Sequence, residues 1–260
     1  MKGNSRIPLC FMYNIYIGNF MDFSLRLGHS VLKFEAEHSQ IIGFFKDFIV
    51  ESAECMNVIR VGTYEVDQYL QQFPGSAWDA YAEYKCLLNL ASDAMMNQQQ
   101  FLFHSAAIII DNQVWLLSGP SGIGKSTQYR NLKTIYGDRI GVVSGDYPVL
   151  VFEDDSIAVF PSPWNGKENW GSMDTGKLAG IILLKQSRVN RFSTLSAEEA
   201  VVPVYKQINT YAKTEEQIHL VADLEERLIT SVPVWSFENT GDLESSRILY
   251  EHILNERRAG

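Results

Sequence analysis

The first part of the chain alternates short apolar runs with polar and glycine positions. Residues 8–35 are rich in aromatic and β-branched side chains and are interrupted at Gly18 and Gly28, which predicts short strands. The apolar segment 41–50 is compatible with a short helix, and the segment 58–66 has the composition of another strand. Short elements of both kinds are typical of a small α+β module.

A helix is expected to follow the turn at Pro74 and Gly75. Ser76 stands at the N-cap position, and Asp79 follows three residues later, as in a capping box. One face of this helix is mostly apolar and consists of Trp78, Tyr81, Lys85, Leu88, Ala91 and Met95. The polar run 97–100 ends the helix. We therefore expect the α+β module to span residues 1–100, where no residue pattern carries recognisable chemistry.

From residue 101 onward, strand-like runs alternate with helical segments. Strands are expected at 106–110, 114–117, 140–143, 149–152, 157–160, 179–184, 191–195 and 232–237. The runs 149–152 and 157–160 predict a hairpin, and 191–195 is expected to pair with 179–184. Ser196 and Glu199 form a second capping box. This alternation predicts an α/β domain over residues 101–260, so the whole chain is a mixed α/β (α+β) protein.

Composition and charge narrow the classes of partner. The net charge is −9, which argues against a nucleic-acid backbone or an anionic membrane as the main partner. Cys10, Cys55 and Cys86 are far apart and show no metal-ligand spacing, which is typical of reduced thiols in a cytoplasmic protein. The apolar start at 7–20 is interrupted by polar residues and lacks a cleavage site, so it is not expected to be a signal peptide.

A glycine-rich motif stands between a predicted strand and a predicted helix. The letters GPSGIGKST match G-x-x-x-x-G-K-[ST] at every position. In such a loop, glycines allow backbone N–H groups to turn inward, and the helix N-terminus adds partial positive charge. The alternative is a glycine-rich turn that contains Lys-Ser by chance. We expect nucleotide phosphates to be bound by Gly119, Pro120, Ser121, Gly122, Ile123, Gly124, Lys125, Ser126 and Thr127.

Two residues are candidates for handling a metal ion and a proton. Lys125 would place a cation at the β and γ phosphates of ATP, and the Ser126 hydroxyl would ligate Mg²⁺. Asp146 follows the apolar strand 140–143, where a nucleotide enzyme holds Mg²⁺ or deprotonates the nucleophile. The alternative for Asp146 is a turn-forming residue after glycine. Ser126 and Asp146 are therefore the predicted metal ligands.

Two further candidates lie outside the motif. His104 opens the strand before it, although a lone histidine at such a position is usually structural. The segment 161–176 is rich in proline, glycine and tryptophan, and irregular segments of this length tend to be functional. We expect it to fold back so that Lys167 reaches the phosphates and Trp164 lines the same cleft. The alternative is a surface loop that covers the core. The predicted catalytic residues are Asp146, His104 and Lys167.

These motifs together resemble the catalytic domain of HPr kinase/phosphorylase, whose fold is shared with phosphoenolpyruvate carboxykinases. The resemblance covers roughly residues 101–240 and rests on His104, on the run SGIGKS at 121–126, and on the strand that ends at Asp146. The whole chain is more similar to uncharacterised bacterial HPr-kinase-like proteins. They share the N-terminal module, the turn 145–148, an SPWxGK-type loop and the segment 195–200.

The resemblance implies a P-loop kinase that phosphorylates a small molecule or a peptide. Two features depart from HPr kinases: Gly145 precedes Asp146 where the family has two adjacent aspartates, and the downstream Glu-Arg-Gly signature is absent. HPr is therefore not the expected substrate. The expected activity is transfer of the γ-phosphate of ATP to a serine-type hydroxyl, with Mg²⁺ as cofactor. A nucleotide-binding module or an ATPase that regulates a partner is the alternative, and a homo-oligomer stays open.

Overall fold

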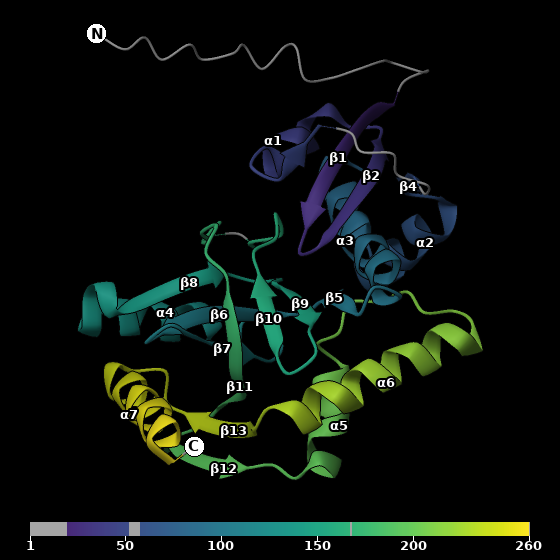
Figure 1. The fold of residues 1–260 in the computed structure, drawn as a ribbon. Coiled ribbons are helices and arrows are strands. Elements are labelled where there is room, and N and C mark those ends of the chain that lie inside the picture. Colours follow the sequence, from purple (N-terminus) through teal and green to yellow (C-terminus); the bar gives the residue numbers. More distant parts are fainter. Residues whose placement is uncertain (1–19, 52–57, 167, 260) are drawn as a thin grey trace, which may run out of the picture. The chain divides into compact units, whose positions relative to one another are not determined.

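The computed structural model describes residues 20–51, 58–166 and 168–259 of the chain. The backbone divides into two compact units, Met1–Ala91 and Ser92–Gly260, each with its own sheet (Figure 1). The division falls inside helix α3 (Ala80–Met96), whereas the expected boundary followed residue 100. The mixed α/β fold class predicted from the sequence is confirmed.

The first unit is built on a four-stranded sheet in the order β3-β1-β2-β4. Its elements are β1 (Met21–Leu27), β2 (Ser30–Ala36), η2 (Ser39–Ile41), α1 (Ile42–Phe45), β3 (Ile49–Val50), β4 (Val58–Arg60), α2 (Thr63–Gln72) and the start of α3. Strands β1 and β2 form a hairpin that turns at Gly28, whose φ of 57° suits glycine. The rings of Phe23, Phe34 and Phe45 pack with centroids 5.5 to 6.5 Å apart and centre the core of this unit.

The strand expected over 58–66 is wrong in its second half. Strand β4 ends at Arg60, and helix α2 begins at Thr63. Gly62 is the N-cap of this helix, and its N–H donates to Glu65 Oε2 at 3.0 Å. A carboxylate at the third helical position therefore starts a helix at a point where the apolar pattern alone suggests a strand.

The start of the next helix is also later than expected. Helix α3 begins at Ala80 and not near Ser76. The capping side chain is Asp79, whose Oδ1 accepts hydrogen bonds from the N–H groups of Tyr81 and Ala82 at 3.0 Å each. Aspartate satisfies the exposed N–H groups of a helix start as well as serine does, so Asp79, expected at the third helical position, is itself the cap.

The second unit contains a nine-stranded sheet with the main order β5-β9-β10-β11-β7-β6-β8, and β13 joins β11 to β12. Its strands are β5 (Gln100–Leu102), β6 (Ser105–Ile110), β7 (Gln113–Ser118), β8 (Ile140–Ser144), β9 (Val149–Phe152), β10 (Ile157–Phe160), β11 (Gly176–Gln186), β12 (Arg191–Thr194) and β13 (Val234–Asn239). Its helices are α4 (Lys125–Tyr136), η3 (Gly137–Arg139), α5 (Ala197–Tyr205), α6 (Glu215–Ser231) and α7 (Leu243–Ala259).

Helices cover both faces of this sheet, because side chains along its strands alternate between two cores (Figure 1). On β6, Ile108 and Ile110 join the core that contains Leu132 of α4 and Leu249 of α7. Ala107, which precedes Ile108, joins the other core together with residues of α5 and α6, and the intervening Ile109 packs against that core. The central strands are buried on both sides, which explains their nearly continuous apolar sequence.

Two pairings expected from the sequence have different outcomes. The hairpin of β9 and β10 is confirmed, with Phe152 opposite Ile157. The expected pairing of 191–195 with 179–184 is wrong, because β13 lies between them. Strand β13 runs parallel to β11 and antiparallel to β12, where Arg191 is opposite Glu238. Strand β13 follows β12 by some forty residues, so no local sequence pattern predicts that it lies between β11 and β12.

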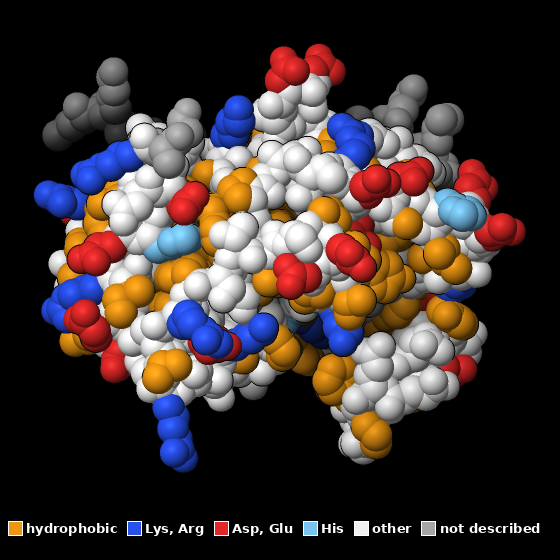
Figure 2. Space-filling view, turned by 90° about the horizontal axis from the view of Figure 1, so that it is seen from below, with side chains coloured by type: hydrophobic (Ala, Val, Ile, Leu, Met, Phe, Trp, Pro, Cys, Tyr) orange, Lys and Arg blue, Asp and Glu red, His pale blue; other side chains and the backbone are white. Residues whose placement is uncertain are grey.

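Basic and acidic side chains are interspersed over the face drawn in Figure 2, with hydrophobic side chains between them. On this face the Lys and Arg side chains do not form a single continuous stripe. Among the described residues, no helix combines the length and the apolar character needed to cross a membrane.

Candidate functional site

The topology of the second unit brings three chain segments to one edge of the sheet. Strand β6 lies between β7 and β8 and is antiparallel to both. The start of β6 at Ser105 is therefore beside the end of β7 at Ser118, and Ala107 is beside the end of β8 at Ser144. The glycine loop follows β7, Asp146 follows β8, and His104 precedes β6. The pairing of β6 with β7 and β8 is therefore enough to bring His104, the glycine loop and Asp146 to the same edge of the sheet.

The glycine loop runs from β7 into α4 in a conformation that favours glycine. Gly119, Gly122 and Gly124 have φ values of 140°, 79° and 115°, which L side chains rarely adopt. Gly124 is the N-cap of α4 and provides no side-chain cap for the N–H groups of the first helical turn. Ser126 and Thr127 are partly exposed within that turn. A loop of this kind presents backbone N–H groups and hydroxyls to an anion.

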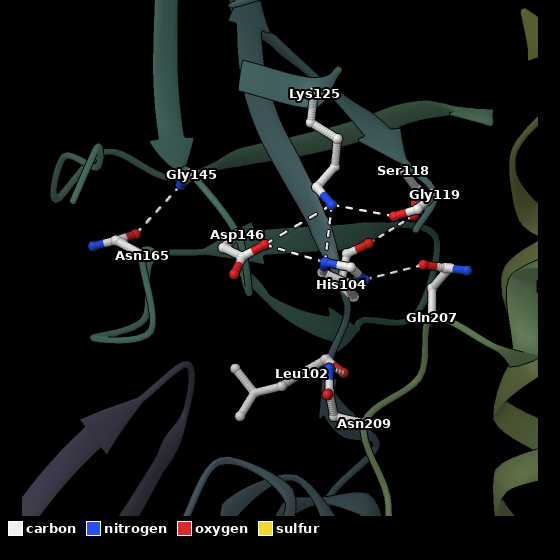
Figure 3. Close-up of polar contacts among 10 residues, drawn as sticks. All are labelled: Leu102, His104, Ser118, Gly119, Lys125, Gly145, Asp146, Asn165, Gln207 and Asn209. Atoms are coloured by element: carbon white, nitrogen blue, oxygen red, sulfur yellow. Dashed lines mark hydrogen bonds and ion pairs between the residues drawn. The ribbon is translucent and has the colours of Figure 1, made fainter. Parts of the chain in front are cut away.

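Lys125 folds back over the loop and is only 7% exposed. Its Nζ donates a hydrogen bond to the Gly119 carbonyl oxygen at 3.1 Å. The same Nζ lies 2.9 Å from His104 Nε2 and 4.0 Å from Asp146 Oδ1. Figure 3 shows the three side chains pointing toward one another. The lysine of the motif, the histidine and the aspartate therefore form one contiguous group.

The backbone of His104 is held at both ends. Its N–H donates to the Gln207 carbonyl oxygen at 2.7 Å, and its carbonyl oxygen accepts from Ser118 Oγ at 2.7 Å. The imidazole stacks on the ring of Tyr147, with centroids 5.0 Å apart. Its Nε2 lies 3.2 Å from Asp146 Oδ1, and its Nδ1 lies 3.2 Å from Gln207 Oε1. Both ring nitrogens therefore have polar partners.

The turn that carries Asp146 is fixed against the start of β6. The carbonyl oxygen of Asp146 accepts a hydrogen bond from the Ser105 N–H at 2.7 Å. Tyr147 N–H donates to the Trp164 carbonyl oxygen at 3.1 Å, and Ser162 Oγ donates to the Tyr147 carbonyl oxygen. Asp146 is thus held by backbone contacts on both sides, and its carboxylate faces His104 and Lys125.

The loop after β10 packs on this turn. Asn165 Oδ1 accepts from Ser144 Oγ at 3.0 Å and from the Gly145 N–H at 3.4 Å. A Cβ at Gly166 would lie 3.2 Å from Asp146 Cβ. The loop therefore runs directly alongside Asp146. Lys167, the next residue along the chain, lies outside the described residues.

Trp164 does not line an open cleft as expected. Its side chain has no exposed surface and belongs to the interior. The Trp164 carbonyl oxygen accepts a hydrogen bond from the Tyr147 N–H, which fixes the loop backbone at this residue. The loop composition, with Pro161 and Pro163 shortly before this tryptophan, predicts an apolar ring that lines the cleft, but burial of its large apolar area is the stronger effect.

Gly145, which stands where the resembling family has an additional aspartate, has a steric role. A Cβ at this position would lie 2.9 Å from the Trp170 carbonyl oxygen and 3.0 Å from the Asn165 carbonyl oxygen. Both are backbone atoms, which cannot yield as a flexible side chain can. The backbone of the loop therefore occupies the space that a side chain at 145 would need.

The sequence did not single out Gln207 or Asn165 as site residues. Gln207 follows α5, more than a hundred residues after His104, and no motif surrounds it. Asn165 stands inside the loop that was identified, but asparagine beside glycine is common in any turn. Within the described part of the chain, no group of three or more His, Cys, Asp or Glu residues could hold a metal ion by itself.

Comparison with known proteins adds little to this geometry. No protein-family model matches the chain, and no curated protein matches its sequence. Among solved structures, the chain is similar to the Hpr(Ser) kinase/phosphatase from Coxiella burnetii, at 12% identity and a TM-score of 0.34. The similarity covers 61% of this chain and 93% of that one.

Proposed function

We propose that this protein binds Mg-ATP at the loop 119–127 and transfers the γ-phosphate to a hydroxyl group of a small molecule or a peptide. One observation carries the proposal. Lys125, at the end of a glycine loop that opens a helix, has its Nζ within 4.0 Å of both a histidine and an aspartate from neighbouring strand ends. A phosphate-binding cation, a carboxylate and an imidazole are the groups that phosphoryl transfer to a hydroxyl requires.

The loop and Lys125 bind the phosphates in this proposal. The left-handed glycines turn backbone N–H groups toward an anion, and the N-terminus of α4 adds favourable partial charge. Lys125 Nζ, now bonded to the Gly119 carbonyl oxygen, would exchange that neutral partner for a phosphate oxygen. A charged acceptor makes a stronger hydrogen bond than a carbonyl does, so the exchange is favourable.

The residues present fit a magnesium ion. Mg²⁺ prefers oxygen ligands, keeps several waters and needs only one or two protein groups beside the phosphates of its nucleotide. The Ser126 hydroxyl in the first turn of α4 and the Asp146 carboxylate supply such oxygens. When bound, the ion neutralises charge on the transferring phosphate. The expected ligands are therefore Ser126 and Asp146, with ATP as the substrate that completes the site.

Proton transfer is assigned to Asp146. The acceptor hydroxyl loses its proton to the Asp146 carboxylate as the oxygen attacks the γ-phosphorus and ADP leaves. The Lys125 ammonium lies 4.0 Å from Asp146 Oδ1 and 2.9 Å from His104 Nε2, and its charge favours the ionised carboxylate. Lys167 remains in the proposal as a second cation for the transferred charge, because the preceding Gly166 lies against Asp146. A cytoplasmic location would supply ATP and keep the cysteines reduced.

A second candidate function is a nucleotide-binding module or an ATPase that regulates a partner. It is favoured by Gly145, since the loop backbone excludes a second carboxylate next to Asp146. With only Asp146 at this turn, one group would have to serve both the proton and the metal. In that case nucleotide binding would persist without transfer to an acceptor.

Incubation with [γ-³²P]ATP and Mg²⁺ separates these functions. The acceptors are a pool of hydroxyl-bearing metabolites and a library of serine-containing peptides, resolved by chromatography. Label on an acceptor supports the kinase. Label released only as inorganic phosphate supports the ATPase, and ATP binding without loss of label supports the module.

A further inference from the structure

A short segment after α5 is paired with the stretch that carries His104. Phe103 and Ile208 form an isolated antiparallel bridge. On one side of it, the His104 N–H donates to the Gln207 carbonyl oxygen at 2.7 Å. On the other side, the Asn209 N–H donates to the Leu102 carbonyl oxygen at 3.1 Å, and Asn209 Nδ2 donates to the same oxygen at 3.3 Å. Figure 3 shows Gln207 and Asn209 on this segment, with only Gln207 directed at the imidazole.

The orientation of the Gln207 side-chain amide follows from its partners. Gln207 is 7% exposed, and its Nε2 donates to the Pro203 carbonyl oxygen at 3.2 Å. A carbonyl oxygen can only accept, so the amide nitrogen must face Pro203. Its oxygen Oε1 therefore faces His104 Nδ1, at 3.2 Å. Because an amide oxygen can only accept, Nδ1 must carry the hydrogen of this bond.

The other ring nitrogen then faces the charged groups. In the neutral ring with hydrogen on Nδ1, Nε2 has a free lone pair. Nε2 can accept a hydrogen bond from the Lys125 ammonium, which lies 2.9 Å away. The opposite tautomer would place an N–H of the ring against the N–H groups of Lys125. It would also place a bare Nδ1 against Gln207 Oε1. The contact of Nε2 with Asp146 Oδ1, at 3.2 Å, would favour a hydrogen on Nε2 instead. The contacts with Gln207 and Lys125 both favour the hydrogen on Nδ1, and the nearby Lys125 ammonium offsets the charge of the carboxylate.

We infer that Gln207 is a positioning residue that fixes His104 as the Nδ1–H tautomer, and thereby fixes the ammonium of Lys125 between the glycine loop and Asp146. The inference rests on the proposed function for its catalytic consequence, since the position of Lys125 matters most when phosphate is bound. Gln207 does not touch the reacting atoms and acts through His104. The tautomer itself is a property of the free protein.

The test is a long-range ¹H–¹⁵N spectrum of the histidine side chains in the full chain without nucleotide, recorded with neutral rings. The two tautomers give different cross-peak patterns, and the His104 signals are assigned by their loss in His104→Gln. We expect His104 to carry its proton on Nδ1 in the wild type. A proton on Nε2 in the wild type overturns the inference without any variant.

Two variants of Gln207 and one matched control complete the test. Gln207→Leu removes the acceptor and should convert His104 at least partly to the Nε2–H form. Gln207→Glu keeps an acceptor oxygen and should preserve the wild-type pattern. Asn209→Leu removes a side-chain hydrogen bond from the same paired segment without touching the imidazole, and should also leave the pattern unchanged. An unchanged tautomer in Gln207→Leu, or a change in Asn209→Leu equal to that in Gln207→Leu, overturns the inference.

Enzyme kinetics test the catalytic consequence of the inference. If the protein transfers phosphate, Gln207→Leu should lower kcat by on the order of 10-fold or more, as losing the partner of a functional histidine does. Asn209→Leu should stay close to the wild type. An unchanged kcat in Gln207→Leu overturns the catalytic part of the inference. If no transfer occurs in the wild type, the proposed function fails, whereas the tautomer is still decided by the spectra.

Discussion

Lys125 Nζ and His104 Nε2 lie 2.9 Å apart, although the two residues belong to different strand ends separated by a complete hairpin. The contact exists because β6 and β7 are antiparallel, so the residue before β6 meets the loop after β7. The same lysine approaches Asp146 to 4.0 Å. The Lys125 ammonium is therefore held by His104, beside the Asp146 carboxylate at the expected reaction centre.

Asp146→Asn is expected to leave Mg-ATP binding within a few-fold of the wild type and to lower turnover by about 100-fold or more, because it removes a positioned base or metal ligand. The change keeps the size of the side chain and the backbone contacts of the turn. Titration calorimetry measures binding, and label transfer measures turnover. Asp154→Asn, on the exposed turn between β9 and β10, is the matched control. Full turnover in Asp146→Asn would reduce Asp146 to a turn residue.

The elements that place these residues were largely predictable. The strands around the glycine loop, the helix after it and the strand before Asp146 follow from hydrophobic periodicity and from one local motif. Because those signals are local, the sequence indicates them well. The expected pairing of 191–195 failed since β13 enters the sheet from far along the chain.

The contacts within the site were less predictable for the same physical reason. Gln207 reaches His104 across 103 positions, and a glutamine beyond a helix end has no pattern that distinguishes it from a surface residue. From the sequence, Gly145 indicates only a missing carboxylate, because the sequence does not show that backbone atoms of Asn165 and Trp170 fill its surroundings. Such steric facts arise only when distant segments are packed together.

Gly145→Ala tests the steric role of that glycine. The added Cβ would lie 2.9 Å from the Trp170 carbonyl oxygen, so the loop has to shift. We expect a loss of about 1–3 kcal/mol in the free energy of unfolding, typical of overpacking. The control is Gly43→Ala, where nothing lies within 4 Å of the added Cβ. Urea denaturation measures the free energy of unfolding of both variants and of the wild type. Equal stabilities of the two variants would show that the loop does not need glycine at 145.

Glu225 on α6 predicts a pH dependence of stability. Its side chain is 5% exposed, and burial raises the pKa of its carboxyl from 4.5 to about 7. The folded protein therefore holds this proton more tightly than the unfolded chain does. The stabilisation is complete below the unfolded pKa and is lost as the pH rises through about 7.

Glu225→Gln should remove that dependence. At about pH 8 the variant should be more stable than the wild type by roughly 1–3 kcal/mol, and at about pH 4 the two should be similar, because both side chains are then neutral. Thermal unfolding across this range gives the comparison. Glu226→Gln, exposed on the same helix, should show no such crossover. A constant difference between Glu225→Gln and the wild type at all pH values would mean that Glu225 titrates normally.

The central claim is that the loop 119–127 binds the phosphates of ATP through Lys125. Titration of Mg-ATP into the wild type and into Lys125→Met, by isothermal calorimetry, tests it most directly. Methionine keeps much of the apolar stem of this buried lysine and removes the ammonium group. We expect binding in the wild type and a loss of affinity on the order of 100-fold or more in the variant, for a charged contact to phosphate. Equal affinity of the two proteins for Mg-ATP, or no binding by the wild type, would contradict the claim.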